Sequence, residues 1–270
     1  IIYCCKNIHI KCLNSMGNIG NLINGNGGIC KKKFNNYSRG NEILNCSFVG
    51  NITNINYKSL YQVETSGGIL GSDSLSNCPN FSVKNCYSEG NIGTHCGGII
   101  GSNSCDGNGI IEECGSNGTI GKFAGGIIGS YSLNANSRDN YEINIDKCYS
   151  SGDIDIFGGG IVGAYCGRHY FDSRTSSITK TMTLNIKNSY SEGIIGENAG
   201  GIIGINSLFR LIESCYTLGN IGNNGGGIAM NPIYTLAELV ELEHVKISNL
   251  DTTIIKNCFS VGNIGSNSGG

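Results

Sequence analysis

Fourteen cysteines are the residues of this 270-residue chain with the greatest capacity for chemistry, because thiolates attack disulfides and bind soft metals. The sequence contains a repeated motif, and Ser189 occupies a position that is cysteine in most other copies of it. This position therefore requires a small buried side chain rather than a disulfide bond. No C-x₂-C pair typical of zinc sites occurs. We therefore predict a column of free thiols that behave as small hydrophobic groups, formed by Cys46, Cys86, Cys114, Cys148, Cys215 and Cys258.

Other cysteines lie outside this position. Cys30, Cys78, Cys105 and Cys166 fall in segments of variable length, and Cys4-Cys5 lies near the start. A disulfide between Cys78 and Cys105 is one hypothesis, if the protein occupies an oxidising compartment. Free thiols are the alternative.

The remaining ionisable residues form no recognisable catalytic set. The four histidines, at positions 9, 95, 169 and 244, do not occupy equivalent positions of the repeated unit. No G-x-S-x-G, H-E-x-x-H or P-loop motif is present. β-Helical enzymes that act on polysaccharides align carboxylates on an outer face; the nearest equivalents here are Glu89, Asp153, Asp155 and Glu192. Asp153 and Asp155 are nearest to that pattern, and we interpret Glu89 and Glu192, which lie on separate coils, as solvated side chains. The sequence predicts no catalytic residue, no metal site and no cofactor.

A repeated unit must position all these residues. In six copies of the unit a cysteine or serine, which we call the anchor, lies 11 residues before a Gly-Gly pair, as from Cys86 to Gly97. Side chains alternate after the anchor with the period of a β-strand, so Cys86, Ser88 and Ile92 point inward while Tyr87 points outward. An inward ladder of isoleucines follows, formed by Ile92, Ile120, Ile154, Ile195, Ile221 and Ile264.

This pattern predicts an all-β parallel solenoid, in the form of a right-handed β-helix of seven to eight coils. The aliphatic pair after each Gly-Gly is expected to form a short third strand. Residues 1–270 form one domain, with a degenerate first coil (1–40), regular coils (40–270) and an insertion (229–253) that could hold a short helix. We expect the chain to be a fragment of a longer protein.

Composition narrows the range of partners. Charged residues make up 14% of the chain, against roughly 25% in typical proteins, and the net charge is −2. This balance predicts no nucleic-acid partner, and the absence of a long apolar run predicts no membrane insertion. The 43 glycines fit tight turns and close packing between coils.

The repeat resembles the GLUG repeat of bacterial surface adhesins and immunoglobulin A1 protease-like proteins. The resemblance rests on the Cys-Tyr-Ser-x-Gly-x-Ile-x-Gly phrase that begins at Cys86 and on the downstream Gly98-Ile-Ile-Gly101. It covers residues 40–270 well and 1–40 poorly. The resemblance implies a surface-exposed, non-catalytic stalk or adhesive region.

Two groups of residues could contact partners. The first is a loop whose aromatic and charged side chains suit a glycan or protein: Arg168, His169, Tyr170, Phe171, Asp172 and Arg174. The second is an outward aromatic ladder, interrupted at Gly115 and formed by Tyr87, Tyr149, Tyr190, Tyr216 and Phe259. Packing of either group against the chain itself is the alternative.

The favoured hypothesis is a structural or adhesive rod in a surface fibre, filament, cell-surface or virion assembly, in an extracellular location. Its expected partners are other copies of itself, adjoining segments of the same chain, glycans or surface proteins. The alternative is a carbohydrate-active β-helix of the lyase or hydrolase kind. Glycan binding compared with polysaccharide cleavage discriminates the two.

Overall fold

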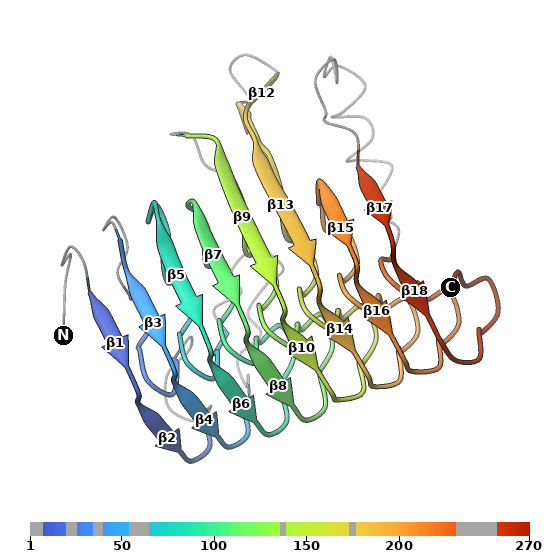
Figure 1. Cartoon of the computed structure of the whole chain (residues 1–270), viewed down its shortest axis with the longest axis horizontal. Helices are drawn as coiled ribbons and strands as arrows, with labels where there is room; N and C mark the ends of the chain where they lie inside the picture. The colour runs from blue at the N-terminus through green and yellow to red at the C-terminus, as the bar shows by residue number, and fades with distance from the viewer. Residues whose placement is uncertain are drawn as a thin grey trace.

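The chain winds into a parallel β-solenoid, which confirms the predicted fold class. The structure is a computed structural model, and it describes residues 8–19, 26–34, 40–53, 65–135, 139–172, 177–230 and 253–270, with backbone alone for 170–172 and 177–179. Each of eight coils contributes one strand to each of two parallel sheets (Figure 1). The predicted helix within 229–253 falls almost wholly outside the described residues.

The first sheet stacks eight strands with equivalent residues side by side, for example Ile43 beside Val83 and Ile111 beside Ile145. Its strands are β1 (His9–Lys11), β3 (Glu42–Leu44), β5 (Phe81–Lys84), β7 (Gly109–Glu112), β9 (Tyr141–Asp146), β13 (Met182–Lys187), β15 (Leu211–Glu213) and β17 (Ile254–Lys256).

The second sheet follows each first-sheet strand after a two-residue corner. Its strands are β2 (Asn14–Met16), β4 (Ser47–Val49), β6 (Tyr87–Glu89), β8 (Gly115–Asn117), β10 (Tyr149–Ser150), β14 (Tyr190–Ser191), β16 (Tyr216–Thr217) and β18 (Phe259–Ser260). Among the described strands, only β11 (Tyr170–Asp172) and β12 (Ser177–Lys180) pair antiparallel, and they project beyond the coils.

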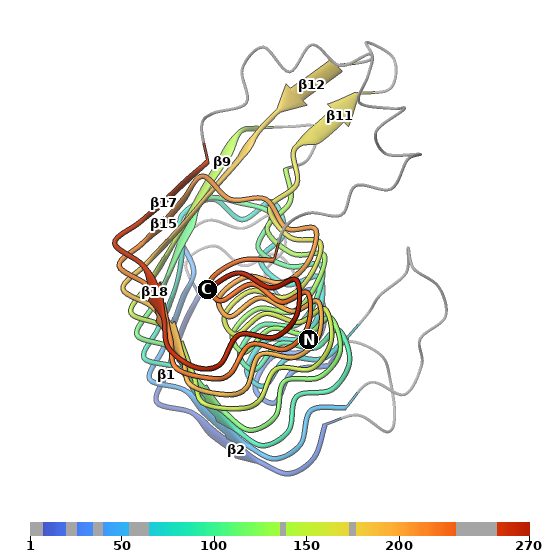
Figure 2. The ribbon, with the colours of Figure 1, turned by 90° about the vertical axis from the view of Figure 1, so that its right-hand side faces the viewer.

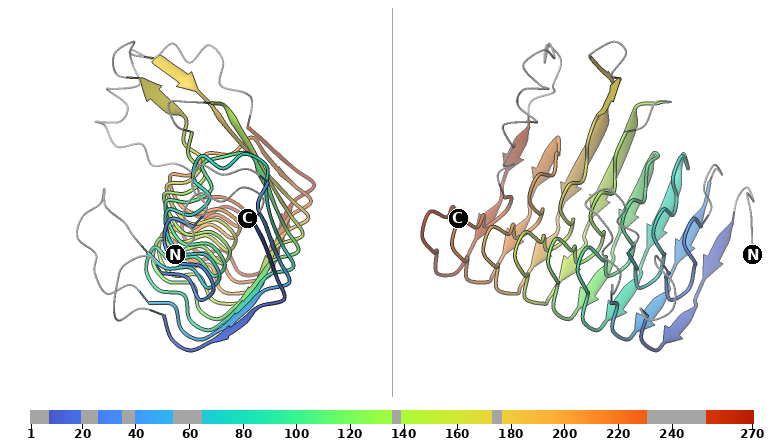
Figure 3. Two further views of the ribbon diagram at one scale, coloured as in Figure 1. Left: turned by 90° about the vertical axis from the view of Figure 1, so that its left-hand side faces the viewer. Right: turned by 180° about the vertical axis from the view of Figure 1, so that it is seen from behind.

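The coils are right-handed. In Figure 1 the labelled strands run downward while the rod advances from left to right. The turned view in Figure 2 shows that these strands lie on the side of the rod that faces the viewer in Figure 1. This is the hand that twisted parallel strands joined by crossovers adopt in nearly all proteins. The views in Figure 3 show the return segments stacked along the opposite side.

The third side differs from the predicted strand. Only isolated bridges join its coils, at the first glycine and the second aliphatic residue, as between Gly97 and Gly125 and between Ile100 and Ile128. Ile99 and Ile100 are consecutive, yet both are fully buried. An extended strand would send one of them outward, so the Gly-Gly-Ile-Ile segment bends instead.

Backbone crowding explains the glycine pair. A Cβ built on Gly98 would lie 2.0 Å from the carbonyl oxygen of Gly126 in the next coil. Only glycine permits this approach. The residue before each anchor turns with positive φ, usually as asparagine, which tolerates that conformation better than most residues; Asn85 has a φ of 50°.

The anchor position accepts cysteine or serine for a local reason. The Cys86 thiol donates to the carbonyl oxygen of Lys84 at 3.3 Å, and the Ser189 hydroxyl donates to that of Lys187 at 2.7 Å. Both side chains thus satisfy the carbonyl two residues earlier, at the corner between the sheets. The same carbonyls also accept a backbone amide of the preceding coil, from Asn45 at 3.0 Å and from Lys147 at 3.2 Å, so the anchor side chain supplies a second hydrogen bond.

The interior is a set of continuous columns. Ile92, Ile120, Ile154, Ile195 and Ile221 are bridged in succession and are at most 3% exposed. Ile264 continues the column in the last coil, where no further described coil covers it, and is 55% exposed.

The residues directly after Gly-Gly-Ile-Ile-Gly also stack in register from coil to coil, although the segments that follow them vary in length. The amide nitrogens of Ser74 and Ser104 donate to the hydroxyl oxygens of Ser104 and Ser132 respectively, each at 3.1 Å. Cys166 stands in the same column, because its amide nitrogen donates to the Ser207 hydroxyl at 3.0 Å. The interpretation of these segments as variable loop was therefore wrong for Cys30, Cys78, Cys105 and Cys166, which are all core residues.

An outer corner is held by asparagine side chains. The amide oxygens of Asn18 and Asn51 accept from the backbone nitrogens of Asn51 and Asn91 in the next coils, at 2.9 and 3.0 Å. Asn220 does the same for Asn263 at 2.9 Å. This ladder gives the abundant asparagines a structural role as links between coils.

Replacing Ile120 by alanine should lower the free energy of unfolding by about 2–5 kcal/mol, because a fully buried side chain is lost from the central column. Ile110→Ala is the control, since Ile110 is 42% exposed and should change stability by no more than ~0.5 kcal/mol. Urea unfolding followed by circular dichroism measures both. Equal losses would contradict the column.

Replacing Ser150 by alanine should leave stability unchanged or raise it. The hydroxyls of Ser116, Ser150 and Ser191 are buried without a hydrogen-bond partner, and an unpaired buried hydroxyl costs roughly 1–3 kcal/mol. Ser189→Ala is the matched comparison and should destabilise, because it leaves the buried Cys148 amide without its partner and removes one of the two hydrogen bonds that the Lys187 carbonyl accepts. Thermal unfolding of the two variants tests the contrast.

Candidate functional site

The outward face of the second sheet carries the predicted aromatic ladder. The rings of Tyr149 and Tyr190 stack with centroids 5.5 Å apart, Tyr190 and Tyr216 at 4.9 Å, and Tyr216 and Phe259 at 5.2 Å, all within 12° of parallel. The tyrosines are half-buried and Phe259 is 54% exposed. Stacked strands force this arrangement, because β10, β14, β16 and β18 place equivalent residues side by side.

Gly115 does not leave a hole in this ladder. The space that a Cβ on Gly115 would fill is taken by the ring of Tyr149, whose Cζ lies 2.3 Å from the Cβ position. Tyr149 therefore leans over the preceding coil toward Tyr87. Burial, reinforced by nearby Tyr87 and Glu192, raises the pKa of the Tyr149 phenol, so the hydroxyl stays protonated and remains a hydrogen-bond donor at neutral pH.

The predicted contact loop is only partly described. Its first residues leave the coil beside Tyr165, where the Arg168 guanidinium lies 5.2 Å from the ring centroid. His169 Nδ1 accepts a hydrogen bond from the amide of Met182 at 3.1 Å, so this ring holds the base of the hairpin. Tyr170, Phe171 and Asp172 form β11, and Arg174 lies outside the described residues.

A second aromatic surface was not predicted. His95, Phe123 and Phe157 stack in one column at 4.8 and 4.9 Å, and Tyr131 and Tyr165 stack beside them at 4.8 Å. The Lys122 ammonium group lies 5.3 Å from the Phe123 ring centroid. We name these five stacked residues the five-ring cluster.

The five-ring cluster occupies strained backbone. All five residues have positive φ, between 58° and 66°, where bulky side chains are rare. Equivalent positions in later coils carry asparagine, as at Asn198 and Asn206, which takes this conformation more easily. The signal for the cluster lay in the residues flanking Gly-Gly-Ile-Ile-Gly: aromatic in three successive units and mostly asparagine elsewhere.

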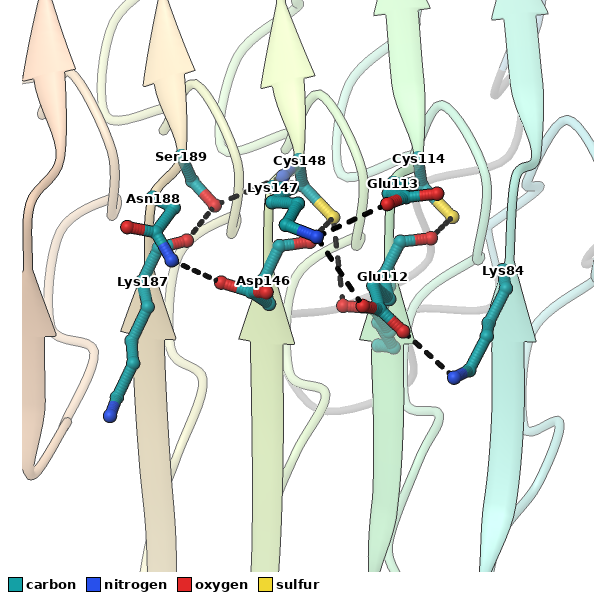
Figure 4. A network of polar contacts seen from close by, with 11 residues as sticks. Lys84, Glu112, Glu113, Cys114, Asp146, Lys147, Cys148, Lys187, Asn188 and Ser189 are labelled. Carbon is teal, nitrogen blue, oxygen red and sulfur yellow. Dashed lines mark hydrogen bonds and ion pairs between the residues drawn. The ribbon is translucent and has the colours of Figure 1, made fainter.

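Charged residues on the first sheet pair from coil to coil (Figure 4). Lys84 contacts Glu112 at 2.7 Å, and Lys147 reaches Glu113 at 3.2 Å and Glu112 at 3.9 Å. Asn188 donates to the Asp146 carboxylate at 2.7 Å. The Lys84 ammonium lowers the pKa of the Glu112 carboxyl through this hydrogen bond and its charge. Exposed pairs of this kind contribute roughly 0–1 kcal/mol each, so their main effect is to disfavour a shifted register.

The buried thiols of the core are poorly reactive. No disulfide joins any of the twelve described cysteines, so the hypothesised bridge between Cys78 and Cys105 is absent. Burial raises the pKa of the Cys166 and Cys215 thiols to about 12. A thiol with such a pKa is almost entirely protonated at neutral pH and is therefore a poor nucleophile.

The outer carboxylates are dispersed among the columns. Glu89, Asp153, Asp155 and Glu192 are all exposed. Asp153 accepts the amide of Ile194 at 2.8 Å, in place of an asparagine in the corner ladder. No cluster of three or more His, Cys, Asp or Glu side chains suited to a metal ion occurs in the described ranges.

Comparison with protein-family models, curated proteins and solved structures finds no match to this chain. Among the residues that the structure describes, no helix has the length and apolar character needed to cross a membrane.

Asp106 should make folding stability depend on pH. Burial raises the pKa of this carboxyl to about 7, although the Asn134 amide donates to it at 3.1 Å. An unfolded aspartate has a pKa near 3.9, so the folded state binds the proton more tightly. The stabilising contribution of Asp106 should therefore be lost as pH rises from about 4 to about 7. His95, whose pKa burial lowers to about 4, acts in the opposite direction over much of the same range.

Asp106→Asn should remove this contribution to the slope of stability against pH, because asparagine does not ionise and can still accept from Asn134. Chemical unfolding at a series of pH values measures the slope in both proteins. Asp153→Asn is the exposed control. An identical slope in the wild type and Asp106→Asn would contradict the assignment.

Proposed function

We propose that this protein is a non-catalytic structural or adhesive rod that presents flat outer faces and projecting loops to partners. The observation that carries the proposal is the continuity of every interior column through successive coils, from Ile52 to Ile264 on one side and from Gly67 to Gly269 on another. Such stacking fills the inside and leaves recognition to the outside.

Three features of the outside support this role. The tyrosine ladder offers aromatic surface on the second sheet, the five-ring cluster offers it beside the third side, and the β11–β12 hairpin projects from the coils. Aromatic side chains supply large contact area at low entropic cost. The expected partners are glycans, surface proteins, further copies of the chain or adjoining segments of the same chain.

The proposed location is extracellular, at a cell or virion surface, in a fibre or filament. This part of the proposal follows from the resemblance to GLUG-repeat adhesins. The described cysteines are compatible with it because most are fully buried and would resist oxidation. Labelling of intact cells or virions with an antibody against the rod tests the location.

The purified chain should scatter X-rays as a stiff rod and release no sugar from polysaccharides. A panel of neutral and acidic polysaccharides, assayed for new reducing ends and for unsaturated products, tests the second point, while a glycan array tests adhesion. Product release that is lost in Glu192→Gln or Asp153→Asn would overturn the proposal and favour a carbohydrate-active β-helix.

A further inference from the structure

The five-ring cluster is an aromatic surface that coil formation does not require. His95, Phe123 and Phe157 lie two residues before bridged Gly-Gly pairs, and the last three coils carry asparagine at the same position, as Asn198, Asn224 and Asn267. All six residues have positive φ, which asparagine adopts with less strain than an aromatic residue. Backbone strain that a simpler residue would relieve is typical of functional positions.

The cluster belongs to complete coils in the middle of the rod. Its three coils contain Gly97, Gly125 and Gly159, and they are bridged to Gly67 on one side and to Gly200 on the other. His95 is buried, whereas the other four rings of the cluster are partly exposed. Their exposure therefore comes from their outward position and not from an uncovered end of the solenoid.

The rings of the cluster cover one another's faces. Phe123 is sandwiched between His95 at 4.8 Å and Phe157 at 4.9 Å, and Tyr131 and Tyr165 cover one face of each other at 4.8 Å. A nucleobase, which binds by stacking on an aromatic face, finds no open face on Phe123. A ligand meets ring edges instead, and because these edges carry partial positive charge, they favour an anionic group.

A cation that pairs with no carboxylate among the described residues lies at these edges. The Lys122 ammonium group is 5.3 Å from the Phe123 ring centroid and 5.5 Å from the Phe157 ring centroid, so it lies beside the stacked pair rather than over one face. On the first sheet, by contrast, Lys187 and Lys256 both contact Glu213, at 3.3 and 2.8 Å. Lys122 is exposed and can pair with an anion from solution.

The carboxylates next to this column of rings are bound within their own coils. Asp155 accepts the backbone amide of Ile156 at 2.7 Å, and Glu197 accepts from the Asn198 side chain at 3.3 Å. Beside the second column of rings, the Arg168 guanidinium lies 5.2 Å from the Tyr165 ring centroid. Each of the two columns of the cluster therefore has a cation beside it.

We propose that the five-ring cluster, with Lys122 and Arg168, binds acidic glycans through a carboxylate or sulfate group. A charge-assisted hydrogen bond from Lys122 holds the anion, and the phenol groups of Tyr131 and Tyr165 exchange hydrogen bonds with sugar hydroxyls. Two cations suit a single acidic sugar, whereas a nucleic acid needs contacts to many phosphates. The inference rests on the proposed adhesive role, because it names the ligand class and the site.

Lys122→Gln tests the site by calorimetric titration. The wild-type chain should bind a short oligomer of a uronic acid, a sulfated oligomer of the same length, or both, and should not bind a neutral one. The variant should bind at least about tenfold more weakly, the effect of losing a hydrogen bond to a charged group. Its affinity should also depend less on salt concentration. The response to the two acidic oligomers distinguishes carboxylate from sulfate.

Phe123→Asn removes the central ring and introduces the residue that later coils carry, so the coil should still fold while binding falls. Circular dichroism checks the fold of each variant. Lys187→Gln, at an ion-paired lysine of the first sheet, and Tyr190→Ala, in the aromatic ladder of the second sheet, are the matched controls. Both should bind the acidic oligomers as the wild type does.

No binding of either acidic oligomer, equal affinity for the neutral oligomer, or full affinity in Lys122→Gln would overturn the inference. Equally tight binding of an acidic peptide that contains no sugar would do the same. Loss of binding in Tyr190→Ala alone would refute this site and leave the proposed adhesive role standing. Release of shortened sugars from the acidic oligomers would overturn the proposed function and this inference with it.

Discussion

Backbone hydrogen bonding between neighbouring coils is the constraint on which the structure depends. Each strand pairs in register with its equivalent in the next coil, so every side chain lies beside the residue that occupies the same position one unit later. A residue is therefore acceptable only if it packs against the residues at the same position in the neighbouring coils. Isoleucine, glycine, serine and cysteine satisfy this condition inside, and asparagine and tyrosine satisfy it outside.

The same constraint makes charge difficult to place. On the outer column of the first sheet, Lys187 contacts Glu213 at 3.3 Å and Lys256 contacts Glu213 at 2.8 Å, so the sign alternates. Where Glu112 and Asp146 are consecutive, Lys147 and Asn188 from the adjacent corner column supply the compensation. Like charges directly opposite one another destabilise a sheet, and a low charge content is one consequence.

Much of this architecture could be predicted from the sequence because the anchor, the inward isoleucine and the Gly-Gly pair keep constant separations. The bend at Ile99 and Ile100 was missed, because a short apolar run does not distinguish a strand from a buried bend. The Ser104 and Cys166 column was missed because its spacing is constant relative to the preceding glycines and not to the next anchor. The five-ring cluster depends on backbone conformation at His95 and Phe123, which the spacing of apolar residues does not encode.

Hydrogen bonds between coils run along the rod, and this direction determines how the molecule bears a load. Interfaces between coils join the two sheets and the third side, and several also join the asparagine corner, for example through the Gly98 nitrogen to the Gly125 carbonyl and the Asn91 nitrogen to the Asn51 side chain. Tension applied along the axis pulls on these bonds in parallel within one interface, and successive interfaces carry the same force in series. Rupture then occurs at the weakest interface, and an extended tether would lengthen in steps of one coil.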